Sequence, residues 1–222
     1  MNKSIERIHF LHIRKTGGTA VKHALSQTAM PHELVLHPHA TRLMDIPLGE
    51  PVFFFLRDPV SRFVSGFNSR LREGRPRYHY PWTVAEREAF TRFPTPESLV
   101  LALASPSTDD RTGADDAMRA IRHVSSSFGD WLGDEAYLRS RRDDLFLIGR
   151  QERLALDFDE LKGRLGLPSD LRLPDDAVEA HRTPPGVDTT LSEASIQVLR
   201  ERYRNDYRLL QVCAELTGPD RH

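Results

Sequence analysis

Residues 8–20 read IHFLHIRKTGGTA, and this stretch decides the fold. Ile8 to Ile13 is mostly apolar, which predicts a strand, and a lysine–threonine–glycine turn over residues 15–19 follows it. Val21 to Met30 reads as a helix that Pro31 ends. In that order, the unpaired amides and the positive end of the helix attract an anion, and the glycines let it approach the backbone. The stretch predicts a phosphate or sulfate site, and a tight turn with a solvated lysine is the alternative.

The same turn excludes two common nucleotide-binding loops. A Walker A loop needs G-x-x-x-x-G-K-[ST], with its lysine after the second glycine, whereas Lys15 precedes both Gly17 and Gly18. Neither that string nor the dinucleotide fingerprint G-x-G-x-x-G occurs anywhere in the chain. The predicted anion site therefore differs from the usual ATP and NAD sites.

Composition indicates a soluble globular protein. The chain has 222 residues, of which 39% are hydrophobic and 28% charged, so we expect one domain over residues 1–222. No run approaches the roughly 18 apolar residues of a membrane span, and nothing resembles a signal peptide. The single cysteine, Cys213, excludes an internal disulfide framework, and we expect it in the core of a cytoplasmic protein. A net charge of −1 gives no support to a nucleic-acid partner.

A second strand-to-helix junction follows the apolar run Val52–Leu56, whose continuous apolarity is typical of a buried parallel strand. Pro59 suits the first position of the next helix, whose predicted core stripe runs from Val60 to Leu71. The opposite face of that helix is expected to carry Ser61, Arg62, Ser65 and Ser69.

Buried strands that alternate with helices predict an α/β domain with a central parallel sheet and flanking helices. Further strands are expected at 33–36 and 145–149, and further helices at 84–93, at 96–104, from Asp115, at 157–165, and from a Ser192 cap to before Gly218. The polar segments 74–83 and 105–113 are expected to be mobile loops.

The two junctions would open at the same edge of a parallel sheet, where ligands bind. Arg57 at a strand end and Ser65 on the following helix offer a guanidinium and a hydroxyl, which suit a phosphate. An ion pair between Arg57 and Asp58 is the alternative. Two anion sites imply a ligand with two separated acidic groups.

This pair of motifs resembles that of sulfotransferases that use 3′-phosphoadenosine 5′-phosphosulfate (PAPS), and is most similar to the carbohydrate branch with its heparan sulfate, chondroitin and bacterial members. Residues 14–19, RKTGGT, resemble the family's 5′-phosphosulfate loop, and residues 57–67, RDPVSRFVSGF, resemble its 3′-phosphate motif. The resemblance implies a three-layer, P-loop-like sulfotransferase fold. It implies that the residues contacting PAPS are Arg14, Lys15, Thr16, Gly17, Gly18, Thr19, Ala20, Arg57 and Ser65. Arg14 departs from the family, which commonly has proline there, so its role is open.

The resemblance also implies the catalytic residues. Sulfuryl transfer needs charge stabilisation on the leaving phosphate, which Lys15 would supply without a metal, and a base for the acceptor's proton. In this family a histidine that precedes the strand corresponding to residues 53–56 is the proposed base, which makes His39 the first candidate and His37 the second. Imidazole suits the role because its ordinary pKa of about 6.5 leaves much of it neutral at pH 7. Glu33 or a residue of the later loops remains an alternative.

An arginine- and tyrosine-rich segment follows the 3′-phosphate motif. Arg70, Arg75, Arg77 and Tyr78 would suit an anionic sugar or another polar acceptor, and a solvated basic loop is the alternative. His123 lies where relatives carry acceptor or cofactor contacts. The sequence shows no spacing that persuades us of a metal site. A P-loop-like kinase and a non-catalytic nucleotide-binding protein are the competing functions.

Overall fold

The computed structural model describes residues 6–176, 186 and 189–218, which form two compact units. Unit 1 comprises Met1–Arg57, Phe128–His181 and Arg208–His222, and unit 2 comprises Asp58–Ser127 and Arg182–Tyr207. A single domain over residues 1–222 stays a prediction.

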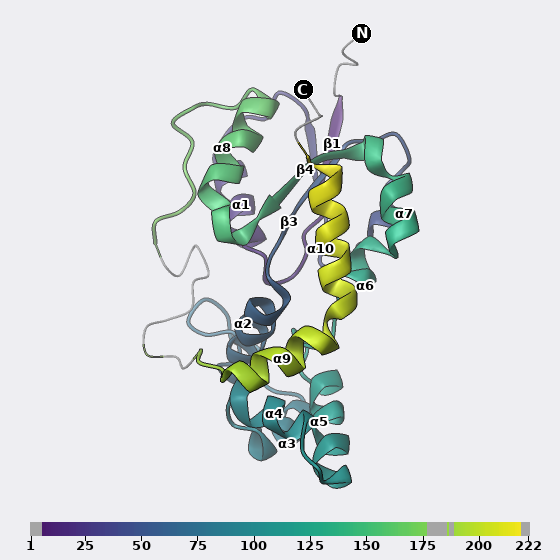
Figure 1. Cartoon of the computed structure of the whole chain (residues 1–222). Coiled ribbons are helices and arrows are strands. Elements are labelled where there is room, and N and C mark those ends of the chain that lie inside the picture. Colours follow the sequence, from purple (N-terminus) through teal and green to yellow (C-terminus); the bar gives the residue numbers. More distant parts are fainter. Residues whose placement is uncertain (1–5, 177–185, 187–188, 219–222) are drawn as a thin grey trace. The chain divides into compact units, whose positions relative to one another are not determined.

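Unit 1 is built on a four-stranded parallel sheet with the order β2-β1-β3-β4 (Figure 1). Its strands are β1 (Arg7–Phe10), β2 (Glu33–Leu36), β3 (Val52–Leu56) and β4 (Leu145–Arg150). Phe10 lies in register with Leu36 on one side and Phe53 on the other, and Phe53 with Leu147. Because all four strands run the same way, their carboxyl ends meet at one edge of the sheet, as expected for an α/β fold that places a site there.

Helices cover both faces of this sheet. On one face, α1 (Gly18–Leu25) and α8 (Leu154–Leu165) share a core cluster with Ile8, Phe10 and Phe53. Figure 1 shows α7 (Glu135–Ser140) and the later part of α10 (Arg204–Leu216) on the other side. Four short elements lie along the same unit: η1 (Leu43–Asp45) precedes β3, α6 (Gly129–Leu132) precedes α7, η2 (Arg142–Asp144) joins α7 to β4, and η3 (Gln151–Arg153) joins β4 to α8. This arrangement confirms the predicted α/β architecture.

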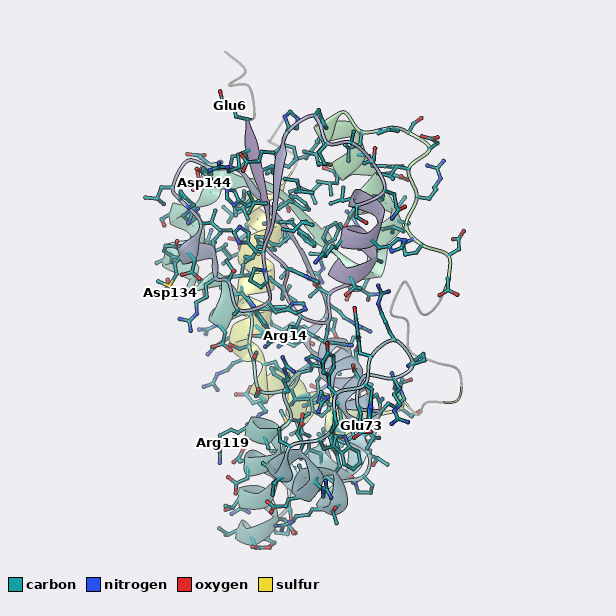
Figure 2. All side chains as sticks on the ribbon, turned by 180° about the vertical axis from the view of Figure 1, so that it is seen from behind. Glu6, Arg14, Glu73, Arg119, Asp134 and Asp144 are labelled. Carbon is teal, nitrogen blue, oxygen red and sulfur yellow. The ribbon has the colours of Figure 1, made fainter. Side chains whose placement is uncertain are left out.

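One buried guanidinium fixes the loop that enters β3. Arg141, at 1% exposure, donates to the carbonyls of Leu43 (2.8 Å) and Pro47 (3.1 Å). Its Nε also donates to Asp144 (2.6 Å), which accepts from the Gly49 amide (3.0 Å) and is labelled in Figure 2. A buried arginine that is bonded on several sides acts as a rigid clamp, so residues 43–49 are held to the sheet's flank.

Unit 2 is helical. Its helices are α2 (Pro59–Leu71), α3 (Val84–Arg92), α4 (Pro96–Leu103), α5 (Thr108–Ala120), α9 (Glu193–Arg202) and the first turn of α10. They pack around a core cluster that contains Phe63, Phe67, Phe90 and Leu199. Side-chain caps begin most of them, and Ser192 caps α9 as predicted by accepting from the amide of Ser195.

The structure corrects several expected elements. Residues 105–113 are not a loop throughout, because α5 begins at Thr108, where the Ser107 hydroxyl caps it. The expected single C-terminal helix is divided into α9 and α10, and the first helix ends at Leu25 rather than Met30. On α2, Arg62 and Ser69 are buried, each at 2% exposure, although the pattern placed them on the polar face.

Cys213 lies in the core of unit 1, as predicted, at 2% exposure. Burial raises the pKa of its thiol to about 12, so it stays protonated at neutral pH. Among the helices that the structure describes, none combines the length and apolarity needed to cross a bilayer.

Candidate active site

The turn between β1 and α1 has a backbone shape that depends on its first glycine. Lys15 and Gly17 have left-handed φ values of 66° and 86°. A Cβ on Gly17 would lie 2.9 Å from a methyl group of Leu154, so the leucine side chain would have to shift to make room for it. The buried Thr16 hydroxyl braces the turn by donating to the carbonyl of Ile13 (3.0 Å). Both the φ angle and the space therefore favour glycine at position 17.

The N-terminus of α1 presents free amides. In the part of the chain that the structure describes, the backbone N–H groups of Gly17, Gly18 and Thr19 donate no hydrogen bond. The first turn contains no acidic residue that could neutralise them. Unpartnered amides and the positive end of the helix dipole together form a site for an anion. Arg14, labelled in Figure 2, lies in the same turn and adds positive charge.

His12 lies directly beneath this helix end. A Cβ on Gly18 would come within 2.7 Å of His12 Nε2 and 3.1 Å of Phe10 Cζ. The His12 ring is in turn 4.0 Å from that of His39, centroid to centroid. Burial lowers the pKa of His12 to about 3, and the charges of His39, Lys22 and Arg14 act in the same direction. His12 is therefore a neutral imidazole between the anion turn and His39.

His39 is held by the backbone on two sides. Its Nδ1 lies 2.8 Å from the carbonyl oxygen of His12, which can only accept, so Nδ1 carries the proton and the lone pair of the neutral ring is on Nε2. Trp131 Nε1 donates to the carbonyl of His39 (2.8 Å). The structure thus places the first candidate base one ring away from the Gly18 turn.

His37 lies in a different environment. Its amide donates to the carbonyl of Phe10 (3.1 Å), which continues the β1–β2 ladder, and its Nε2 lies 2.8 Å from Nδ1 of His9. His9 Nε2 contacts a carboxylate oxygen of Glu50. Burial lowers the pKa of His37, as does His9, while Asp45 opposes them.

Sequence reasoning missed His9, His12 and Glu50. His9 and Glu50 are 41 positions apart and meet only because β1 lies beside β3. No periodicity in a single sequence predicts such a contact. The local signal was that His9 and His12 interrupt the predicted strand Ile8–Ile13, whose other residues are apolar.

Some residues predicted to contact PAPS have other partners. The Ala20 amide donates to the carbonyl of Gly17 (3.1 Å) and its side chain is buried, and its contact with PAPS stays a prediction. Because the Thr16 hydroxyl donates within the turn, its amide is the group left to face an anion. Arg57 follows β3 directly and is half-buried, while Ser65 lies on α2 in unit 2. Asp58 is not simply the ion-pair partner of Arg57, because it caps α2 by accepting from the Ser61 amide (2.8 Å).

Arg70 does not have the acceptor-binding role that was predicted for it. It is 3% exposed, and its guanidinium donates to both oxygens of Glu86 (2.6 Å each) and to the carbonyls of Tyr80 (3.0 Å) and Pro81 (3.3 Å). Burial alone would raise the pKa of Glu86, but the hydrogen bonds from Arg70 and the backbone hold it below its usual value. Arg70 is thus a buried structural residue that stabilises the start of α3, and it does not reach an acceptor.

The other predicted acceptor residues are more accessible. Arg75 and Tyr78 are exposed, and Arg77 Nε donates to the Tyr78 hydroxyl (3.0 Å). The Tyr78 and Tyr80 rings lie 5.7 Å apart. His123 is half-buried, and its carbonyl oxygen would lie 2.9 Å from a Cβ on Gly66, so it packs against α2. All of these residues belong to unit 2.

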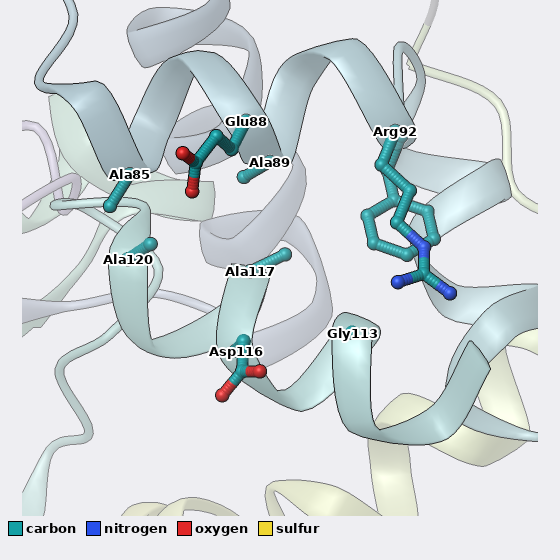
Figure 3. A pocket seen from close by; sticks show the side chains of 9 residues that line it. Ala85, Glu88, Ala89, Arg92, Gly113, Asp116, Ala117 and Ala120 are labelled. Carbon is teal, nitrogen blue, oxygen red and sulfur yellow. The ribbon is translucent and has the colours of Figure 1, made fainter. Parts of the chain in front are cut away.

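A hollow of about 230 Å³ lies between α3 and α5 (Figure 3). Alanines line much of it, and its arginine, Arg92, is paired with Asp109 (2.6 Å) and Asp110 (3.3 Å). It contains none of the predicted site residues. Among the described residues, no group of three or more histidine, cysteine, aspartate or glutamate side chains could hold a metal ion.

A family model described as the sulfotransferase family matches residues 3–211, which is most of the chain. No curated protein matches the chain.

Proposed function

The chain belongs to the sulfotransferase family, and we propose that it transfers a sulfuryl group from PAPS to a hydroxyl group of a carbohydrate or glycan. The observation that carries this proposal is the set of unpartnered amides at Gly17, Gly18 and Thr19, presented next to Lys15 at the carboxyl edge of a parallel sheet. The 5′-phosphosulfate of the donor is the anion that we assign to these amides.

Lys15 and the turn would stabilise the leaving group. In the transfer, the acceptor oxygen forms a bond to sulfur as the bond between sulfur and the phosphate oxygen breaks, so negative charge develops on that oxygen. Fixed amides, with the lysine of the same turn, would lower the barrier by stabilising this charge. The product is 3′,5′-ADP, and Arg57 is the residue of unit 1 that we assign to its 3′-phosphate. Ser65, from the same motif, stays a prediction.

A histidine of the 37–39 pair would take the proton from the acceptor hydroxyl. His39 is supported by its fixed tautomer, since the His12 carbonyl leaves the lone pair on Nε2. His37 is supported by its hydrogen bond to His9. Both follow β2, which pairs with the strand that precedes Lys15.

The carbohydrate acceptor is supported by the accessible arginine and tyrosine side chains of residues 75–80. Tyrosine rings stack on sugars while arginines pair with carboxylates or sulfates, and the Arg77–Tyr78 hydrogen bond orders part of this surface. Arg70 is not part of it. His123 remains a prediction from the resemblance.

Nucleotide binding tests the donor. Thermal unfolding should be measured with 3′,5′-ADP, ATP–magnesium and NAD. At 100 times its Kd, 3′,5′-ADP should stabilise the protein by about 2.7 kcal/mol, which corresponds to a rise in Tm of roughly 5–11 °C for a chain of this size. A rise with ATP–magnesium alone would instead favour a kinase.

Transfer from radiolabelled PAPS tests the reaction and its acceptor. Label should enter at least one member of a library of desulfated glycans. The number of labelled non-carbohydrate alcohols should be smaller than the number of labelled glycans. Binding of 3′,5′-ADP without transfer to any hydroxyl compound would favour a non-catalytic protein. Transfer confined to small non-carbohydrate alcohols would overturn the carbohydrate assignment alone.

A further inference from the structure

Three side chains from separate parts of unit 1 form a chain of hydrogen bonds. His9, on β1, is 4% exposed, and each of its ring nitrogens has a partner: Nδ1 faces His37 Nε2 at 2.8 Å, and Nε2 contacts Glu50. The His9 and His37 rings are nearly parallel (16°), with centroids 5.1 Å apart. That separation is close to the N···N distance plus two ring radii, so the rings meet edge to edge in almost one plane. This geometry is that of a direct N–H···N hydrogen bond.

The chemistry of the three groups fixes the direction of these bonds. An ionised carboxylate can only accept, so Glu50 requires a proton on His9 Nε2. In neutral His9, Nδ1 must then accept, which requires a proton on His37 Nε2. The lone pair of neutral His37 is consequently on Nδ1, the nitrogen that faces away from His9.

From this arrangement we propose that Glu50, His9 and His37 form a proton relay, in which Glu50 and His9 are positioning residues that make His37 the base of the histidine pair. The inference rests on the proposed function and deepens it. When the acceptor O–H bond breaks, its proton forms a bond to His37 Nδ1. The Nε2 proton of His37 passes to His9 Nδ1, which leaves His37 neutral and His9 as an imidazolium next to the Glu50 carboxylate.

The relay gives His37 an advantage over His39 in compensating charge. The group that orients His39 is a backbone carbonyl, which is neutral, whereas the relay ends in a carboxylate that stabilises an imidazolium. Two other charged groups face the relay: Asp45 acts on His37, and Arg7 lies 3.8 Å from the other oxygen of Glu50. The lowered pKa of His37 keeps it neutral, and able to accept a proton, at neutral pH.

Imidazole NMR tests the relay without requiring enzyme activity. In the full chain labelled with ¹⁵N-histidine, neutral His37 should carry its proton on Nε2 and none on Nδ1. Glu50→Gln, which removes the charge and nearly keeps the shape, should increase the fraction of His37 protonated on Nδ1. If Glu50→Gln folds poorly, His9→Phe is the substitute variant, because it keeps an aromatic ring on β1. It should also increase the fraction of His37 protonated on Nδ1. Arg7→Gln is the matched control, because Arg7 contacts Glu50 but not His9, and it should leave the His37 tautomer unchanged.

Kinetics provide the second readout. Glu50→Gln should lower turnover with PAPS by at least about 10-fold, with less effect on the KM for acceptor, while Glu50→Asp should retain more turnover because it keeps the charge. The rise of turnover with pH should disappear in His37→Ala and persist in His39→Ala.

Two results would overturn the relay: a wild-type His37 protonated on Nδ1, or a pH limb that disappears only in His39→Ala. A wild-type protein with the expected tautomer but no transfer from PAPS would disprove the proposed function, while the hydrogen-bonded relay would stand on the NMR result.

Discussion

Gly18→Ala should destabilise the protein because the structure leaves no room for its methyl group. The new Cβ would come within 2.7 Å of His12 Nε2 and 3.1 Å of Phe10 Cζ. Neither ring can move easily. Phe10 is 1% exposed, and its ring centroid lies 4.9 Å from that of Phe53. The ring centroid of His12 lies 4.0 Å from that of His39. The perturbation should therefore spread from the turn to the rings of His12 and His39.

Two opposing effects set the magnitude. Replacing a helical glycine by alanine stabilises by up to about 1 kcal/mol, whereas overpacking costs about 1–3 kcal/mol. With the full helix gain, Gly18→Ala should therefore lose up to about 2 kcal/mol net. The matched control is Gly163→Ala in α8, where an added Cβ meets no described atom within 4 Å and the helix gain should appear alone. Because the helix gain is common to both, the two variants should differ in free energy of unfolding by the overpacking cost, about 1–3 kcal/mol.

Urea unfolding of both variants, with His12→Ala and the double variant Gly18→Ala/His12→Ala, measures this directly. If the clash with His12 is the cause, removing that ring should relieve it, and the double-mutant cycle should show a coupling of about 0.5–3 kcal/mol. The reasoning is refuted if Gly18→Ala is as stable as Gly163→Ala, or if the effects of Gly18→Ala and His12→Ala simply add.

Three further predictions concern charge. Lys15→Ala should lower turnover more than PAPS affinity, because charge builds on the bridging oxygen only as the bond to sulfur breaks. The control is Lys22→Ala, at an exposed lysine of α1. A collapse of PAPS affinity with unchanged turnover would make Lys15 a binding residue. Arg57→Ala should weaken 3′,5′-ADP by about 1.5–3 kcal/mol and 5′-AMP far less, as measured by calorimetry, and equal losses would contradict its placement at the 3′-phosphate. The pKa of His12 is about 3 in the folded protein and about 6.5 when unfolded, so between these values the unfolded state binds the extra proton. The free energy of unfolding should therefore fall as pH falls from 6.5 towards 3, by up to about 1.4 kcal/mol per pH unit from this group. In urea unfolding, His12→Asn should show a shallower decline.

Local patterns in the sequence predicted much of the fold. The strands at Glu33–Leu36 and Val52–Leu56 have the predicted bounds, and the Ser192 cap was also correct, because each depends on a short apolar run or on the chemistry of one turn. The expected loop at 105–113 failed for a local reason too. Ser107 followed three residues later by Asp110 is a helix-start signal, and the Ser107 hydroxyl does accept from the Asp110 amide.

The candidate site was predictable only where it is local. The turn at Lys15–Thr19 and its presented amides follow from one stretch of chain. Arg70 was misassigned because its partner, Glu86, is 16 residues away and their pairing depends on how α2 and α3 pack. The partners of His37 were invisible for the same reason, since Glu50 reaches His9 only through the pairing of β1 with β3.

The order of the strands has a consequence for synthesis of the chain on the ribosome. Phe10 pairs with Leu36 after a short interval, but Phe53 waits for Leu147, and closing the longer loop costs about 1 kcal/mol more. At 5–20 residues per second, β3 spends roughly 5–20 s with one edge unpaired before β4 emerges. Its sequence, Val-Phe-Phe-Phe-Leu, is apolar and uncharged, which is the composition that aggregates through open edges. Pro51 and Arg57 flank it as gatekeepers, so Arg57→Leu should increase the insoluble fraction in chaperone-free translation more than Arg92→Leu does. The arginine that we assign to the nucleotide thus protects the nascent strand before any nucleotide can bind.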